Sequence, residues 1–145
     1  MHLKRIAIAV ALVAGTLAIA VPATASPDGV DSIVKAKMNG NKEAPGPGDG
    51  NGKGEFAATL SADTICYSFY AVKIAAPTAA HIHIAPPGSP GPVVVTLILP
   101  TESGVSACVT PSPADFAAIK ANPSDYYVNV HNAIFPAGAI RGQLG

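Results

Sequence analysis

The sequence predicts an all-β fold, an antiparallel β-sandwich or Greek-key barrel of about eight strands with one short helix. The apolar residues fall in short runs rather than at helical spacing, and Gly, Pro, Asn and Ser separate these runs. The chain has 145 residues, which suits a single compact domain. The predicted strands are Ile33–Met38, Glu55–Leu60, Thr64–Ile74, Ala80–Ile84, Val93–Leu99, Val105–Thr110, Tyr126–His131 and Ala139–Leu144.

One short helix is predicted between the sixth and seventh strands. Ser112 can act as its N-cap, Pro113 suits the first helical position, and Asn122–Pro123 ends the run. Phe116 and Ile119 are three residues apart, so both would face the core. Because two turns of helix do not fold alone, this helix should pack on an edge or end of the sheet.

Two glycine- and proline-rich segments, 39–54 and 85–92, are predicted to be irregular loops, since proline removes the N–H that a sheet needs. The first contains Asp49–Glu55, which begins like a calcium-binding loop. Lys53 stands where a third oxygen ligand belongs, and Leu60 stands where the bidentate Glu should be. Turn formation explains these residues better than calcium binding.

Residues 1–25 have the pattern of a cleaved signal peptide. A short basic segment precedes the apolar run Ile6–Val21, and Ala23–Ala25 has the small residues of a cleavage site. A membrane anchor is the alternative, but a spanning helix needs about 20 apolar residues and this run stops earlier. We therefore expect a secreted or periplasmic protein whose single domain comprises residues 26–145.

Loss of the signal segment also changes the charge. Removing Lys4 and Arg5 leaves seven of nine basic residues against nine acidic ones, a net charge of −2. This balance argues against nucleic acid as a partner. The exported chain has no second apolar stretch of spanning length, so no membrane association is expected after cleavage. The expected partner is an extracellular protein or a small ligand whose identity the sequence does not give.

The two cysteines, Cys66 and Cys108, lie in separate predicted strands. In an oxidising compartment they are expected to form a disulfide, which would stabilise the fold by roughly 3–4 kcal/mol on the chain-entropy estimate. Two free buried thiols are the alternative. Thiolate metal ligation is less favoured because neither residue belongs to a Cys-x-x-Cys pair.

The candidate metal ligands are His81, His83 and His131. In an extended strand His81 and His83 point to the same side, about 6.6 Å apart along the chain. The run ending at His131 places Tyr127, Asn129 and His131 on one side of its own strand. If the two strands are neighbours, the three imidazoles meet and can bind copper or zinc. A hydrogen-bonded structural cluster and a ligand-binding surface are the alternatives.

Arg141 is the one arginine left after cleavage and a candidate ligand contact, together with Asn129. Its planar guanidinium can clamp a carboxylate or another anion. The simpler interpretation is an internal ion pair, or contacts with carbonyl groups that hold the last strand. The sequence contains no Gly-x-Ser-x-Gly turn and no paired carboxylates, so it predicts no catalytic residues.

A series of short motifs follows a recognisable order from about residue 34 to 144. The motifs are Glu43-Ala44-Pro45, Gly48-Asp49-Gly50-Asn51-Gly52, Leu60, Ile65-Cys66-Tyr67, Ala80-His81-Ile82-His83, Gly91-Pro92-Val93-Val94-Val95, Cys108-Val109-Thr110, Tyr127-Val128-Asn129-Val130-His131 and Phe135-Pro136-x-Gly-x-Ile140-Arg141-Gly142-Gln143-Leu144. In order and spacing they resemble the CHRD domain, the module first described in chordin. The resemblance implies an extracellular β-sandwich domain without established catalytic residues.

A looser resemblance is to copper/zinc superoxide dismutase, which also carries a His-x-His on a β-barrel strand. The matching residues would be His81, His83, His131 and Arg141, but the zinc loop has no counterpart here. The expected sandwich is thus immunoglobulin-like or superoxide-dismutase-like. Two functions are expected: a secreted, disulfide-stapled binding or structural module without catalysis, or alternatively a copper- or zinc-binding protein with weak redox activity.

Overall fold

The structure is a computed structural model that describes residues 31–145. The predicted signal segment 1–25 and the predicted start of the exported chain lie outside the described residues. Within 31–145, no helix has the length and apolar character needed to cross a membrane. The elements of this part are β1 (Ser32–Asn39), η1 (Gly40–Lys42), β2 (Lys53–Ser61), β3 (Thr64–Val72), β4 (Pro77–Ile84), β5 (Val93–Thr96), β6 (Val105–Val109), α1 (Pro113–Ala121), η2 (Pro123–Asp125), β7 (Tyr126–Asn132) and β8 (Ile140–Gln143).

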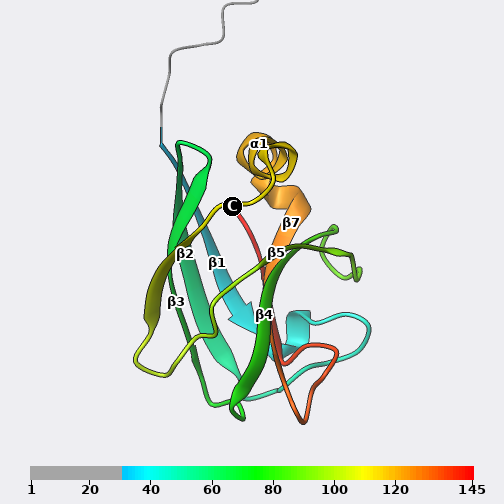
Figure 1. Cartoon of the computed structure of the whole chain (residues 1–145). Helices are drawn as coiled ribbons and strands as arrows, with labels where there is room; N and C mark the ends of the chain where they lie inside the picture. The colour runs from blue at the N-terminus through cyan, green and yellow to red at the C-terminus, as the bar shows by residue number, and fades with distance from the viewer. Residues whose placement is uncertain (1–30) are drawn as a thin grey trace, which may run out of the picture.

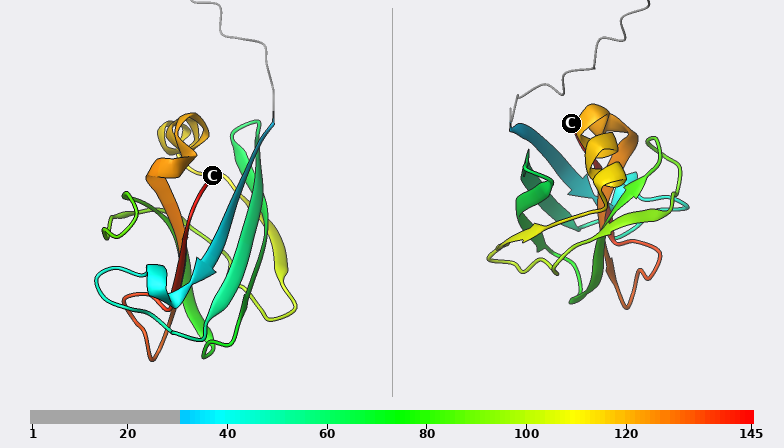
Figure 2. Two further views of the ribbon diagram at one scale, coloured as in Figure 1. Left: turned by 180° about the vertical axis from the view of Figure 1, so that it is seen from behind. Right: turned by 45° about the horizontal axis from the view of Figure 1, so that its top comes forward.

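The eight strands form one antiparallel sheet in the order β5-β4-β7-β8-β1-β2-β3-β6. The sheet curls, so that β1, β2 and β3 lie on one side of the core and β4 and β7 on the other (Figures 1 and 2). At the seam between β1 and β8 the ladder holds a single residue pair, Asn39 with Arg141. Two backbone hydrogen bonds between Lys35 and Gly145, of 2.8 and 3.0 Å, extend the seam. The curled eight-stranded sheet confirms the predicted fold class.

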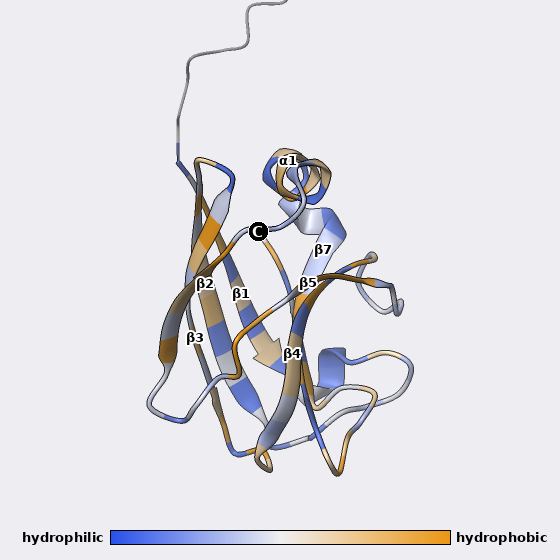
Figure 3. Ribbon diagram, viewed as in Figure 1, coloured by the Kyte–Doolittle hydropathy of each residue, from blue (hydrophilic) through white to orange (hydrophobic). Residues whose placement is uncertain are grey.

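The core consists of side chains at alternate strand positions, because successive residues of a strand point to opposite sides. On β2, Phe56 is buried and Glu55 is exposed, and Figure 3 shows apolar and polar residues alternating along this strand. The Phe56 ring stacks on Tyr67 with 5.4 Å between centroids and meets Phe69 edge-on at 5.6 Å. Further buried residues are Val34, Ala36, Met38, Ala58, Leu60, Ile65, Ala80, Ile82, Tyr126, Val128, Val130 and Ile140.

The helix α1 forms where it is predicted and covers one end of the core (Figure 1). Ser112 caps it, since its Oγ accepts a hydrogen bond of 3.1 Å from the backbone N–H of Asp115. Phe116 and Ile119 are both buried, as their spacing predicts. The helix therefore closes an opening that the curled sheet leaves.

The strand β5 is shorter than predicted and ends at Thr96 instead of Leu99. The backbone N–H of Leu97 still bonds to the carbonyl of Ala80, at 2.9 Å. One residue later, the N–H of Ile98 donates to the Tyr67 hydroxyl at 2.8 Å. The chain thus leaves β4 at this point and crosses to β3 on the other half of the sheet, which ends the strand.

Cys66 and Cys108 form the predicted disulfide, with an S–S distance of 2.06 Å. The two residues face each other in the ladder between β3 and β6. Both half-cystines are exposed, on the outer side of the sheet rather than in the core. The bond therefore joins the edge strand β6 to its neighbour on the surface.

Candidate metal centre

The candidate site lies on the outer side of β4, β7 and β8, which we call the site face. In the ladder between β4 and β7, His81 is paired with Asn129 and His83 with Tyr127, while His131 is opposite Ala79. The alternate residues of both strands point into the core, so these polar side chains must point outward. The pairing of β4 with β7 brings together the three predicted histidines.

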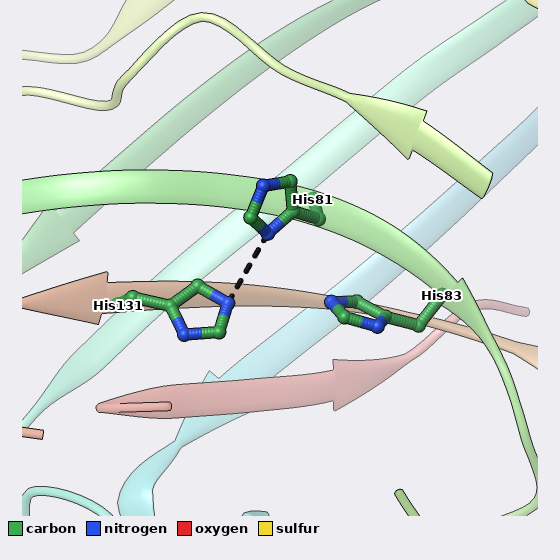
Figure 4. A group of neighbouring side chains, drawn as sticks. All are labelled: His81, His83 and His131. Atoms are coloured by element: carbon green, nitrogen blue, oxygen red, sulfur yellow. Dashed lines mark hydrogen bonds between the residues drawn. The ribbon is translucent and has the colours of Figure 1, made fainter. Parts of the chain in front are cut away.

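The three imidazoles converge on one region (Figure 4). One ring nitrogen from each residue lies within 4.8 Å of the corresponding nitrogens of the other two. Zinc and copper bind imidazole nitrogen at about 2.0–2.1 Å, so three nitrogens spread evenly around one ion lie about 3.3–3.6 Å apart. Closing the widest nitrogen spacing, 4.8 Å, by about 1–1.5 Å therefore brings all three within reach of a common ion.

Two backbone carbonyls fix the orientation of the rings. His83 Nδ1 lies 2.8 Å from the carbonyl oxygen of Gly91, and His131 Nδ1 lies 3.1 Å from that of Pro136. A carbonyl oxygen can only accept a hydrogen bond, so in the neutral rings it is Nδ1 that carries the proton. The Nε2 atom of His131 is then unprotonated and accepts a hydrogen bond of 3.2 Å from His81 Nδ1.

The rings favour their neutral form, which is the form that binds metal. Burial lowers the pKa of the His81 ring, and the nearby rings of His131 and His83 lower it further. Burial also lowers the pKa of His83, against the opposite effect of its bond to the Gly91 carbonyl. At neutral pH both rings are therefore uncharged, and one nitrogen of each ring carries a lone pair instead of a proton.

A stack of three planar groups supports the buried end of the cluster. The His83 ring lies parallel to the Tyr127 ring, with 4.8 Å between centroids and 5° between planes. The Arg141 guanidinium carbon lies 3.4 Å from the centre of the Tyr127 ring. Such a contact between a cation and an aromatic ring is favourable and is strengthened by burial. The stack therefore restricts the His83 ring to movement within its own plane.

Arg141 is 1% exposed and holds the loop over the site face. Its guanidinium donates to the carbonyl oxygens of Ser89 at 2.7 Å and Pro86 at 2.9 Å. The same loop contains Gly91, whose N–H donates to the Tyr127 hydroxyl at 3.2 Å. These contacts correspond to the simpler of the two sequence interpretations of Arg141, and its contact with a ligand stays a prediction.

Two further polar side chains lie behind the rings. Asn129 is 2% exposed, and its Oδ1 lies 3.1 Å from His83 Nε2. Glu43, from the loop after β1, is 9% exposed and faces Asn129 and Arg141. Burial raises the pKa of the Glu43 carboxyl to about 7, although backbone and Asn129 hydrogen bonds and the Arg141 charge act in the opposite direction.

Glu43 is the buried residue of this group that the sequence analysis did not select as functional. Within residues 31–145, its Oε1 has no hydrogen-bond partner. A side chain at Gly138 would overlap its carboxyl group, so the glycine leaves the space that the carboxyl occupies. The available signal was the motif Glu43-Ala44-Pro45, because an acidic residue inside a glycine- and proline-rich loop is otherwise expected to be exposed.

The fold and this site define a small, disulfide-bonded β module with three histidines gathered on the outside of its sheet. The family model of the CHRD domain matches residues 34–144, and the chain belongs to the CHRD domain family. CHRD domains are extracellular, and the disulfide agrees with an oxidising compartment. A search of curated proteins and a search of solved structures each found no significant match.

Proposed function

We propose that this CHRD domain is a secreted binding module without catalytic activity, and that its ligand is a copper or zinc ion held by His81, His83 and His131. The observation that carries the proposal is the convergence of three ring nitrogens within 4.8 Å of one another. The three residues come from two neighbouring strands, which are more rigid than loops. A rigid arrangement of this kind reduces the cost of bringing the ligands together.

The surroundings of the rings also support a metal ligand. Histidines that bind metal commonly donate their second ring N–H to a carbonyl or carboxylate, which sets the tautomer. His83 and His131 make this contact with Gly91 and Pro136. Imidazole ligands suit both Cu²⁺ and Zn²⁺, and this donor set alone does not separate the two ions.

The non-catalytic part of the proposal rests on what the rings contact. Their hydrogen bonds go to two carbonyl groups, to one another and to Asn129. General-base catalysis would instead place a ring nitrogen against a nucleophilic side chain such as a serine or a cysteine. The rings are therefore held in position, as in a binding site.

A structural role without metal is the second candidate. The hydrogen bond of 3.2 Å between His81 and His131 favours it, because the cluster already satisfies part of its own hydrogen-bonding capacity. In that case the histidines connect β4, β7 and two loops, and the partner of the module binds elsewhere on its surface. The two candidates differ in one measurable quantity, the uptake of metal.

The experiment compares metal uptake by the exported chain and by the double variant His81→Ala/His83→Ala. Each protein is titrated calorimetrically with Cu²⁺ and with Zn²⁺, and retained metal is counted after dialysis. A control variant, Lys35→Ala/Glu55→Ala, alters exposed residues on the opposite half of the sheet. We expect one ion per chain in the wild type and the control, and none in the histidine variant. Equal uptake by all three folded proteins would reject the metal site.

A further inference from the structure

The side chain of Asn129 contacts Nε2 of His83, the ring nitrogen that would bind a metal ion. Asn129 is on β7, paired with His81 of β4 on one side and with Arg141 of β8 on the other. Its Oδ1 is 3.1 Å from His83 Nε2, in a part of the site face that solvent does not reach. The contact is therefore built into the sheet, between two side chains that cannot turn to solvent for other partners.

A neutral His83 ring cannot donate a hydrogen bond to both of its neighbours. Its Nδ1 faces the carbonyl oxygen of Gly91 at 2.8 Å, and its Nε2 faces the oxygen of Asn129. A neutral imidazole, the form that binds metal, has a single N–H. With the proton on Nδ1, Nε2 needs a donor, which Asn129 supplies when its amide is turned over. In either orientation the amide lies within hydrogen-bond geometry of Nε2, on the side from which an ion would bind.

An ion and the Asn129 amide exclude each other at this nitrogen. A copper or zinc ion would lie about 2.0–2.1 Å from Nε2, along its lone pair. With the amide atom at 3.1 Å and in hydrogen-bond geometry, the ion would approach it to about 1–2 Å, too close for an amide that stays in place beside Nε2. Metal binding at His83 therefore requires Asn129 to move away.

We propose that Asn129 competes with the metal for His83, so that it holds the ring in the metal-free cluster and is displaced when the ion binds. This inference rests on the metal site proposed above, and it identifies Asn129 as a residue that sets the metal affinity of that site. The same argument does not apply to His131, whose Nε2 faces another ligand ring, His81. His81 must move its proton from Nδ1 to its other ring nitrogen before both of the facing nitrogens can bind the ion.

The displaced amide has a partner on its other side. Glu43 faces Asn129, and its Oε1 lacks a hydrogen-bond partner among the described residues. Asn129 already hydrogen-bonds to the Glu43 carboxyl, and an amide that leaves His83 can turn a further N–H to the free Oε1. The movement thus exchanges one buried hydrogen bond for another, so Asn129 weakens metal binding without preventing it.

The test removes the competing amide and measures the affinity for the metal alone. Asn129→Ala deletes the side chain, whereas Asn129→Leu keeps a group of similar size beside His83. For Asn129→Ala, calorimetry with Zn²⁺ and Cu²⁺ should give one ion per chain and a Kd about 3- to 10-fold lower than in the wild type, the equivalent of one hydrogen bond. Asn129→Leu should not tighten binding. Lys35→Ala/Glu55→Ala, which changes exposed residues on the opposite half of the sheet, is the control and should leave the affinity unchanged.

A second measurement uses the wild-type chain and needs no variant to fold. During a Zn²⁺ titration followed by NMR, the Asn129 side-chain amide signals should shift together with the His83 ring nitrogens. Unchanged or weaker affinity in folded Asn129→Ala, or Asn129 signals that do not move while zinc binds, would overturn the competition and leave the metal site intact. A wild type that takes up no metal would reject the metal site and this inference with it.

Discussion

On both halves of the sheet, outward-facing residues alternate with core residues. The outward-facing residues are exposed on one half and buried on the other. On β1, β2 and β3 the outward residues, such as Lys35, Glu55 and Cys66, are exposed. On the site face, the outward residues Asn129 and Arg141 are buried to 98% or more. The difference is the cover: loops tied down by hydrogen bonds to Arg141 and His131 lie over the site face, whereas the opposite side faces water.

This difference decides what each polar residue contributes to stability. A polar group in water exchanges one partner for another, so its removal changes little. A buried polar group without a partner costs about 1–3 kcal/mol, and more when it is charged. The site face must therefore satisfy its polar groups internally, and it is the region where substitutions should have the largest effects.

The largest expected effect is that of Arg141→Leu. The substitution leaves the carbonyls of Ser89 and Pro86 without their donors and releases the loop. We expect a loss of about 3–5 kcal/mol of unfolding free energy in denaturant titrations. Lys35→Leu on the exposed side should change it by less than about 0.5 kcal/mol. Similar small losses at both positions would show that the two sides do not differ as described.

Removal of the disulfide tests the exposed side by itself. Cys66→Ala/Cys108→Ala should lower the unfolding free energy by roughly 3–4 kcal/mol, because the closed loop restricts the unfolded chain. The bond lies on β3 and β6, away from the histidine strands β4 and β7. Metal affinity should accordingly remain that of the wild type. A folded variant with much weaker metal binding would mean that the two regions are coupled.

The pH dependence of stability tests the burial of Glu43. Its pKa is raised from 4.5 to about 7 in the folded chain, so the protonated form stabilises the fold fully below pH 4.5. That contribution is lost as the pH rises through about 7. Relative to Glu43→Gln, the wild type should lose up to roughly 3 kcal/mol between pH 4.5 and 8, and less if water reaches the carboxyl. Parallel stability curves for the two proteins would contradict a buried carboxyl.

The smallest expected effect is the stabilisation of the fold by metal. Zinc at a hundredfold excess over its Kd should raise the unfolding free energy of the wild type by about 2.7 kcal/mol. The triple variant His81→Ala/His83→Ala/His131→Ala should gain nothing. The comparison is made by thermal unfolding with and without zinc, and an equal gain in both proteins would place the ion outside the site face.

The alternation of apolar and polar residues was sufficient to predict the strands and the outward direction of the histidines. The side-chain period of two places Tyr127, Asn129 and His131 on one side whatever lies next to their strand. The helix was predictable for a similar reason, because Ser112 and Pro113 act locally. Local rules of this kind do not depend on the rest of the fold.

The pairing of β4 with β7 and the loops that cover the site face could not be predicted from these local patterns. These two strands are separated by β5, β6 and α1 in the chain, and neither strand carries a signal that selects the other. The burial of Glu43 depends on contacts between loops that are distant in the sequence. The end of β5 at Thr96 depends on the Tyr67 hydroxyl of another strand in the same way.

The most direct test of the proposed function is X-ray absorption at the metal edge of the copper- or zinc-loaded exported chain. Three imidazole nitrogens at about 2.0 Å from the ion are expected, and their number should fall with each histidine that is replaced by alanine. A first shell without imidazole, or one that stays the same in the triple alanine variant, would contradict the site.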